Sequence, residues 1–179
     1  TKLAYIHSHG TDPGIIFCPG FQSSMRGTKS RALYTNLCQN LGLEYTTLDY
    51  HGHGESLLSE DGCKGGAAGT IGQWKDDALA ILDEVTTNSR QIIVGSSMGG
   101  WLSFLMAMER RERVAGIVGV ATAPDFTSTI CERIRRDGTL SRQMSSWGYC
   151  NLPTDYEESG FYRIDFELLD EAENHFLLT

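Results

Sequence analysis

Five residues at positions 95–99 have the types and the spacing of a serine nucleophile. They read Gly-Ser-Ser-Met-Gly, which matches G-x-S-x-G with Ser97 at its centre. Ser96 does not fit the pattern, because valine stands two positions before it. The apolar strand expected at 91–94 and the helix expected at 98–109 flank the motif, as a nucleophile elbow requires. The pattern therefore predicts that Ser97 attacks an acyl carbon; the alternative is a glycine-rich turn without chemistry.

The two glycines of the motif have a physical purpose. The serine of such an elbow adopts a strained backbone with positive φ, so that its Oγ projects from the carboxyl edge of the sheet. Gly95 and Gly99 leave room for that tight turn, because neither carries a Cβ. The helix that begins at Met98 also directs the positive end of its dipole toward the reacting centre.

Acyl transfer also needs two N–H donors for the developing oxyanion. One is predicted to be the N–H of Met98, the residue after the nucleophile. The second donor comes from a loop after an early strand, and Cys18-Pro19-Gly20-Phe21 ends such a strand. We therefore predict that the Phe21 N–H is the second donor; the alternative is an ordinary turn at the end of a strand.

Residues 49–56 (DYHGHGES) fit a D-x-x-G-x-G-x-S loop that follows a core strand in many α/β hydrolases. The glycines permit tight turns, and Asp49 is expected to accept hydrogen bonds from N–H groups of the loop. The loop is therefore predicted to be structural and not catalytic.

No cofactor or metal site is predicted. The histidine pairs His7/His9 and His51/His53 have H-x-H spacing, but an antiparallel first strand would place them at opposite ends of the sheet. The five cysteines form no metal-binding spacing and are interpreted as reduced thiols. The basic residues 110, 111 and 113 are expected to complement the dipole at the end of the helix that follows Ser97.

The elements that position these residues alternate between strands and helices. Strands are predicted over 2–7, 15–18, 44–50, 91–94 and 114–120, a turn over 12–14, and helices over 29–41, 73–86 and 98–109. This alternation is typical of an α/β fold: a mostly parallel sheet with helices on both faces. Residues 1–124 are assigned to the core and 125–179 to a small cap, within a single domain. The cap is expected to consist of turns, aromatic residues and one acidic helix over 166–176.

Composition excludes several partners. The 179-residue chain carries a net charge of −8, which argues against a nucleic-acid partner. Its longest apolar run, Val114–Ala123, is too short to span a bilayer, so no integral membrane segment is predicted.

Several motifs together resemble a known family. FCPGF, DYHGHGES, GSSMGGW and the segment from Trp147 onward look like the mitochondrial palmitoyl-protein thioesterase family called abhydrolase domain-containing protein 10. The resemblance implies an α/β-hydrolase fold, mitochondrial location, and a Ser–Asp–His hydrolase that removes S-acyl groups from proteins and cleaves acyl-glucuronide esters. It places Ser97 as nucleophile and Phe21 and Met98 as oxyanion donors. The glycine-rich stretch 62–69 departs from the family pattern.

The triad order in this fold is Ser, Asp, His. By resemblance, the Asp and His would follow the cap, and the last strands of the fold are therefore expected to lie beyond Thr179. His175 and the acids of the cap are not expected to complete the triad; these acids are Asp125, Asp137, Asp155, Asp165 and Asp170. The chain alone is expected to turn over little substrate and to aggregate, or to dimerise, through an exposed strand at 114–120.

Two other functions stay open at this point. One is an inactive truncated isoform or partial product that acts at most as a binding module, and the other is a peptidase on the same fold. Residue patterns leave the acyl chain length, the leaving group and the oligomeric state open. They also leave a cytoplasmic location as the alternative to the mitochondrial one.

Overall fold

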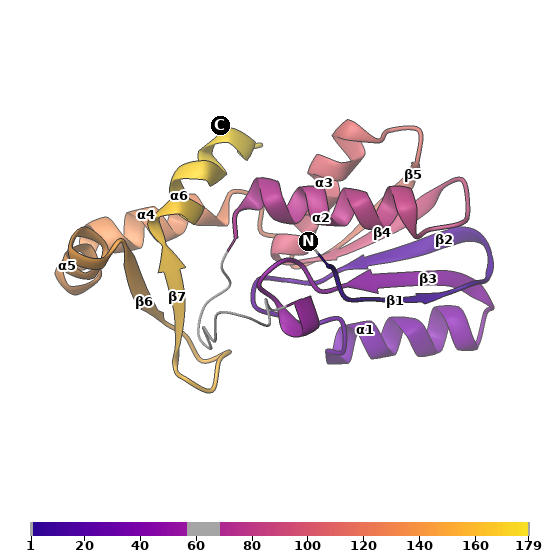
Figure 1. Ribbon diagram of the computed structural model, residues 1–179, viewed down its shortest axis with the longest axis horizontal. Helices are drawn as coiled ribbons and strands as arrows, with labels where there is room; N and C mark the ends of the chain where they lie inside the picture. Colours follow the sequence, from indigo (N-terminus) through magenta and orange to yellow (C-terminus); the bar gives the residue numbers. More distant parts are fainter. Residues whose placement is uncertain (1, 57–68, 179) are drawn as a thin grey trace.

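The computed structural model describes residues 2–56 and 69–178. Its main sheet has five strands in the order β1-β3-β2-β4-β5 (Figure 1). These strands are β1 (Tyr5–Ser8), β2 (Thr11–Cys18), β3 (Leu43–Leu48), β4 (Gln91–Ser96) and β5 (Val114–Val120). Only β1 runs antiparallel to its neighbour, so the carboxyl ends of the other four strands meet at one edge.

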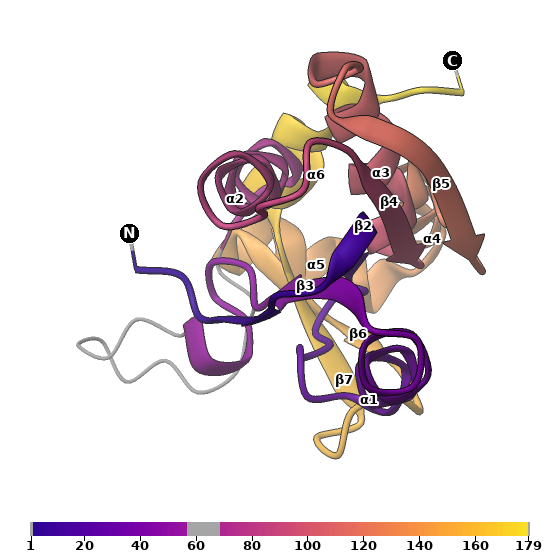
Figure 2. The same ribbon diagram turned by 90° about the vertical axis from the view of Figure 1, so that its right-hand side faces the viewer.

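Helices cover both faces of the sheet. Helix α1 (Thr28–Leu33), continued by a π-helical segment (Tyr34–Gln39), lies on one face, and α2 (Ile71–Glu84) and α3 (Met98–Glu109) lie on the other (Figure 2). The central strands are apolar throughout because helices cover both faces of the sheet. Strand β2 illustrates this, since its successive side chains point to opposite faces. Ile16 joins the cluster under α2 and α3, whereas Ile15 and Phe17 join the cluster under α1. The predicted fold class is thereby confirmed.

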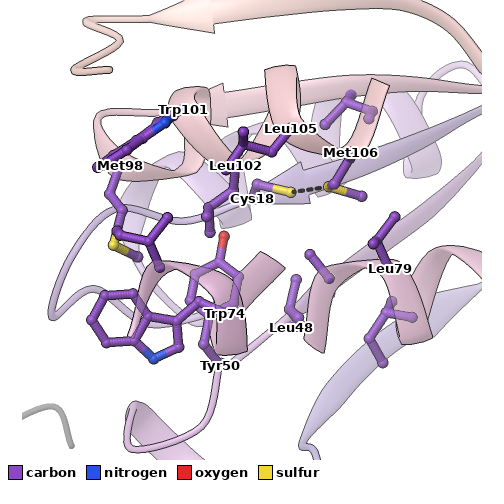
Figure 3. Packing of buried hydrophobic residues seen from close by; sticks show 14 of the residues in the cluster. Cys18, Leu48, Tyr50, Trp74, Leu79, Met98, Trp101, Leu102, Leu105 and Met106 are labelled. Atoms are coloured by element: carbon purple, nitrogen blue, oxygen red, sulfur yellow. Dashed lines mark hydrogen bonds between the residues drawn. The ribbon is translucent and has the colours of Figure 1, made fainter. Parts of the chain in front are cut away.

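The larger cluster holds the elements that carry the nucleophile. Trp74 from α2, Trp101 and Leu102 from α3, and Leu48 from β3 have no exposed surface (Figure 3). The thiol of Cys18, at the end of β2, lies 3.9 Å from the sulfur of Met106 on α3. This packing fixes α3 against the sheet, and therefore fixes the turn between β4 and α3.

The rest of the chain forms a second layer beyond the carboxyl edge of the sheet. It comprises α4 (Phe126–Arg136), α5 (Gly138–Trp147), a hairpin of β6 (Tyr149–Pro153) and β7 (Phe161–Asp165), α6 (Phe166–Ala172) and a 3-10 turn (Glu173–His175) (Figure 1). It has its own apolar cluster, which includes Ile134, Leu140 and Ile164. Leu168 and Ala172 of α6 belong to the main cluster, so the two layers share a core. That this layer acts as a cap stays a prediction.

Several sequence-based expectations are wrong in detail. The layer contains three helices and a hairpin, where turns and one helix over 166–176 were expected. The turn expected at 12–14 lies inside β2, because Thr11 already pairs with Leu43 before the register shifts. The helix expected at 73–86 begins at Ile71, where Thr70 caps it by accepting a hydrogen bond from the Gln73 N–H. The helix expected at 29–41 changes to π-helical hydrogen bonding after Leu33.

No helix in the described parts of the chain is long and apolar enough to cross a membrane.

Candidate active site

Ser97 lies in the turn between β4 and α3 with φ 53° and ψ −121°. Few non-glycine residues adopt this strained backbone, which needs support from its surroundings. The Ser97 N–H donates to the carbonyl of Val120 at 3.0 Å, and its carbonyl accepts from Gly100 and Ala123 at 2.9 and 3.2 Å. These three bonds hold the turn. The Ser97 side chain is half-buried, whereas Ser96 is buried.

The glycines around Ser97 mark close backbone approaches. A Cβ on Gly99 would lie 2.0 Å from the carbonyl oxygen of Cys18, and one on Gly95 would lie 2.4 Å from the carbonyl oxygen of Gly99. Gly20, which the sequence analysis did not single out, is a third: its Cβ would lie 3.2 Å from the Ser97 Cβ. The loop after β2 therefore lies directly beside the serine.

Phe21 and Met98 reach the same edge of the sheet. They follow the ends of β2 and β4, which are neighbouring parallel strands with Cys18 paired to Gly95. Met98 is the first residue of α3, and N–H groups in the first turn of a helix have no acceptor within the helix. The roles of both N–H groups as oxyanion donors stay predictions.

The side chain of Phe21 has a structural position that its sequence context did not reveal. Its ring lies 5.4 to 6.1 Å, centroid to centroid, from the rings of His53, Trp74, Phe126 and Tyr162. Two of these rings belong to the core and two to the second layer. Phe21 therefore joins the layers beside the serine.

Ser97 opens into a cavity of about 640 Å³ between the sheet edge and the second layer. Apolar residues from both layers line most of it, together with two cations; the lining residues are Gly20, Phe21, Gln22, Ser23, Lys29, Ser96, Ser97, Ala121, Ala123, Phe126, Ile130, Arg133, Leu152, Pro153, Thr154, Tyr156 and Tyr162. In the part of the chain that the structure describes, neither a histidine nor an acid is among them.

The histidines after the sheet strands have structural partners. His175 Nε2 lies 2.6 Å from Glu171, whose carboxylate also accepts from the Gly72 N–H at the start of α2. This cluster ties α6 to α2, in agreement with the structural role expected for His175. His53 is buried, and its Nδ1 lies 3.1 Å from the carbonyl of His51. Burial lowers the pKa of His53 to about 4.

Asp49 and Asp125 bind backbone N–H groups. Asp49 accepts from Met25 at 2.6 Å and from Glu55 at 2.8 Å, which confirms its predicted structural role. Burial raises the pKa of Asp49. Asp125 accepts from Leu177 and Leu178 and so holds the segment after α6. The other four acids considered for the triad also lie outside the cavity lining; they are Asp137, Asp155, Asp165 and Asp170.

The histidine pairs lie at opposite ends of β3, as predicted. His7 pairs with Thr46 inside β3, and His9 follows the last pair of β1, Ser8 with Tyr45, toward the start of β3. His51 follows the carboxyl end of β3. Within residues 2–56 and 69–178, no group of three or more His, Cys, Asp or Glu side chains is placed to hold a metal. The glycine-rich stretch 62–69 lies outside the described residues except for Gly69, and so does Cys63.

The basic cluster contacts the ends of two helices, α3 as expected and also α2. Arg113 donates to the carbonyl of Leu82 at 3.1 Å, in the last turn of α2, and to that of Ser89 at 3.0 Å. Arg110 pairs with Asp83 at 3.0 Å. Arg110 also donates to the carbonyl of Glu109, the last residue of α3, at 3.2 Å, as expected. Arg113 instead caps α2, because the end of α2 packs beside the end of α3.

Comparison with known proteins gives consistent matches. Residues 11–155 match the family model described as serine aminopeptidase, S33. The chain is 40% identical over 177 residues to the mitochondrial palmitoyl-protein thioesterase ABHD10 of Bos taurus, and 39% identical to that of Homo sapiens. Each alignment covers 99% of this chain and 55% of the relative. The chain therefore spans about half the length of the curated relatives it matches.

Two solved structures are similar over 98% of the chain. One is the mouse alpha/beta hydrolase domain-containing protein 10, with a TM-score of 0.79, 37% identity and 66% of that chain covered. The other is a putative hydrolase from Agrobacterium vitis S4, with a TM-score of 0.78, 28% identity and 72% of that chain covered.

Proposed function

Because the chain belongs to the serine aminopeptidase, S33, family and has the α/β-hydrolase fold, we propose that it is an acyl hydrolase with Ser97 as its nucleophile. The observation that carries the proposal is the backbone of Ser97, with φ 53° at the junction of β4 and α3 and an opening into the cavity. A strained serine at such a junction is the geometry of a nucleophile elbow.

In the proposed reaction, Ser97 Oγ attacks the acyl carbon and the N–H groups of Phe21 and Met98 hold the oxyanion. The thiol or alcohol leaves with a proton, and water then releases the acid from the acyl-enzyme. A histidine base and its carboxylate are needed for both steps. Among the described residues that line the cavity, none is a histidine or an acid.

The proposed substrates are S-acylated proteins and small acyl esters. The curated relatives are palmitoyl-protein thioesterases, and the apolar part of the cavity, with Phe126, Ile130 and Leu152, is suited to an acyl chain. A mitochondrial location is part of the same proposal, because these relatives are mitochondrial.

The test is covalent labelling of the natural protein with a fluorophosphonate, combined with hydrolysis of a palmitoyl-cysteine peptide. We expect one adduct, on Ser97 by peptide mass spectrometry, and loss of hydrolysis by several orders of magnitude in Ser97→Ala. Ser96→Ala is the matched control, because it removes the neighbouring hydroxyl and leaves the elbow residue in place. An adduct on Ser96, or full hydrolysis by Ser97→Ala, would refute the proposal.

A peptidase is the second candidate, favoured by the description of the matched family model. The two candidates are distinguished by comparing hydrolysis of an aminopeptidase substrate with hydrolysis of the thioester. Both reactions would depend on Ser97, but only one of the two bonds, amide or thioester, would be cleaved efficiently.

A further inference from the structure

The loop that carries the Phe21 N–H has a strained backbone. The carbonyl of Gly20 accepts a hydrogen bond from the Ser23 N–H at 3.0 Å, which closes a four-residue turn. Gln22, the third residue of that turn, has φ 54°, in the left-handed region that few residues other than glycine adopt. Such a conformation persists only where neighbouring groups determine it. The turn supplies one such contact after Phe21, and the segment before Phe21 has another.

Tyr50 holds the segment before Phe21. Its hydroxyl donates to the carbonyl of Pro19 at 3.2 Å, and the tyrosine has no exposed surface. Burial raises the pKa of Tyr50 well above its usual value, so the hydroxyl keeps the proton that it donates. Figure 3 shows this hydroxyl directed toward Cys18 at the end of β2. The Pro19 carbonyl also lies against α3, because a Cβ on Gly99 would collide with its oxygen. The peptide group after Pro19 is therefore fixed in direction.

Tyr50 is itself held by α2. The next residue, His51, donates its N–H to Asp77 at 2.7 Å, and its carbonyl accepts from the indole of Trp74 at 3.0 Å. The Tyr50 ring packs edge to face against the ring of His53, at 5.6 Å between centroids. Because the adjoining backbone and the ring are both fixed, the hydroxyl is a rigid reference point for the loop.

The two contacts determine where the Phe21 N–H points. In a trans peptide the C=O and N–H groups lie in one plane and point in opposite directions. The Gly20 carbonyl is turned toward Ser23, so the Phe21 N–H is turned away from it. Tyr50 fixes the preceding peptide group, relative to which this one would otherwise rotate. The loop also lies beside the nucleophile, since a Cβ on Gly20 would be 3.2 Å from that of Ser97.

We propose that Tyr50 is a positioning residue for the oxyanion donor, which acts through the carbonyl of Pro19 and does not itself touch the substrate. This inference rests on the proposed function, in which the Phe21 N–H holds the oxyanion. A donor that is already oriented stabilises the transition state without reorganisation during the reaction. Loss of the Tyr50 hydroxyl would leave the buried Pro19 carbonyl without this hydrogen bond and would allow the loop to rotate.

The test compares Tyr50→Phe with Tyr45→Phe in the natural protein. Tyr45 is the matched control, because it is equally buried, lies in β3 and donates to the carbonyl of Ser30 at the same distance, 3.2 Å. It packs under α1, on the opposite face of the sheet from the cluster that contains Tyr50. Each substitution removes one buried hydroxyl, so the two variants should lose similar stability in urea.

Hydrolysis of the palmitoyl-cysteine peptide should separate the two variants. We expect kcat to fall by about tenfold to a hundredfold in Tyr50→Phe, because a misdirected donor is lost only from the transition state. The KM should not change in this variant. Both kcat and KM should be unchanged in Tyr45→Phe.

Inhibition by hexadecyl trifluoromethyl ketone reports on the oxyanion directly. Ser97 Oγ adds to the ketone carbon and gives its proton to the base, and the carbonyl electron pair becomes the oxyanion of the adduct. The inhibition constant should therefore rise in Tyr50→Phe by the factor by which kcat/KM falls. A loss of stability alone would lower the fraction of folded protein and leave this constant unchanged.

The amide resonances of Gly20 and Phe21 report on the loop without any reaction. In proton–nitrogen correlation spectra both should shift in Tyr50→Phe and neither should shift in Tyr45→Phe. Unchanged loop resonances in Tyr50→Phe would overturn the inference, and so would an unchanged kcat or an equal fall of kcat in both variants. Failure of the proposed function gives a different result, since the natural protein would then neither hydrolyse the peptide nor be labelled at Ser97. That result would also remove the catalytic role of Tyr50, while the resonances would still show whether it holds the loop.

Discussion

At the scale of single residues, Ser97 shows how a strained backbone is maintained. Its positive φ is held by three backbone hydrogen bonds, one to Gly100 in the first turn of α3 and two to Val120 and Ala123, at and just after the end of β5. Strain at one residue persists where its surroundings determine the conformation more strongly than the residue itself.

His53 should make the stability of the protein depend on pH. Burial lowers the pKa of His53 from 6.5 to about 4, because the charged form of the ring loses its solvation. Between these values the unfolded chain binds a proton that the folded protein does not. Stability is therefore full above pH 6.5 and falls as the pH drops toward 4, by about 3 kcal/mol for a shift of this size. Urea unfolding across this range measures the loss.

His53→Gln is the comparison for that measurement, since glutamine does not titrate but still offers polar atoms to the carbonyl of His51. The variant should lose less stability than the natural protein on the same acidification. Parallel pH curves for the two proteins would mean that His53 is not the group responsible.

At the scale of elements, the junction of β2, β4 and α3 depends on glycine. Gly99→Ala should lower the free energy of unfolding by about 3 kcal/mol or more. The new Cβ would lie 2.0 and 2.4 Å from the carbonyl oxygens of Cys18 and Pro19, in the backbone at the end of β2. Gly138→Ala is the control, as a Cβ there meets nothing within 4 Å. Denaturant midpoints for the two variants test this. Similar midpoints would contradict the close approach of α3 to the loop after β2.

Phe21 should couple the two layers through its ring. Phe21→Ala removes contacts to Trp74 of the core and to Phe126 and Tyr162 of the second layer, and should cost about 2 kcal/mol for a half-buried aromatic residue. Hydrogen exchange should quicken in β6 and β7 more than in β2 and β4. Phe21→Leu, which keeps an apolar side chain and the backbone N–H, should show a smaller effect. Equal exchange in all four strands would rule out this coupling.

At the scale of the whole molecule, the sheet has an apolar strand at its β5 edge. In the described chain β5 pairs only with β4, and Val118 and Val120 are 51% and 37% exposed. Such an edge is a template for pairing with another chain. This agrees with the expectation that the 179-residue chain self-associates, which stays a prediction.

Val118→Lys should therefore reduce self-association of the 179-residue chain, measured by light scattering and by sedimentation, without lowering its unfolding temperature. Leu41→Lys makes the same exchange at a residue that is 64% exposed and away from the sheet edge, and should leave association unchanged. If both substitutions reduce association equally, added charge and not the β5 edge is the cause.

Short-range pattern was sufficient to predict the parallel sheet, the elbow around Ser97 and the role of Asp49. Each of these features depends on residues that are close in sequence, such as a strand, a glycine-bounded turn and the helix after it. Asp49 binds the N–H of Glu55 only six positions later, so the loop pattern already contained that contact.

Only the tertiary structure decided the partners of residues that are far apart in the sequence. Asp125 binds the N–H of Leu177 across 52 positions, Arg113 caps α2 and not the helix that precedes it, and Phe21 packs against Phe126 and Tyr162. The sequence carries no local periodicity for such contacts, because they form only when separate elements pack together. The same packing places Lys29 and Arg133 around one cavity with Ser97.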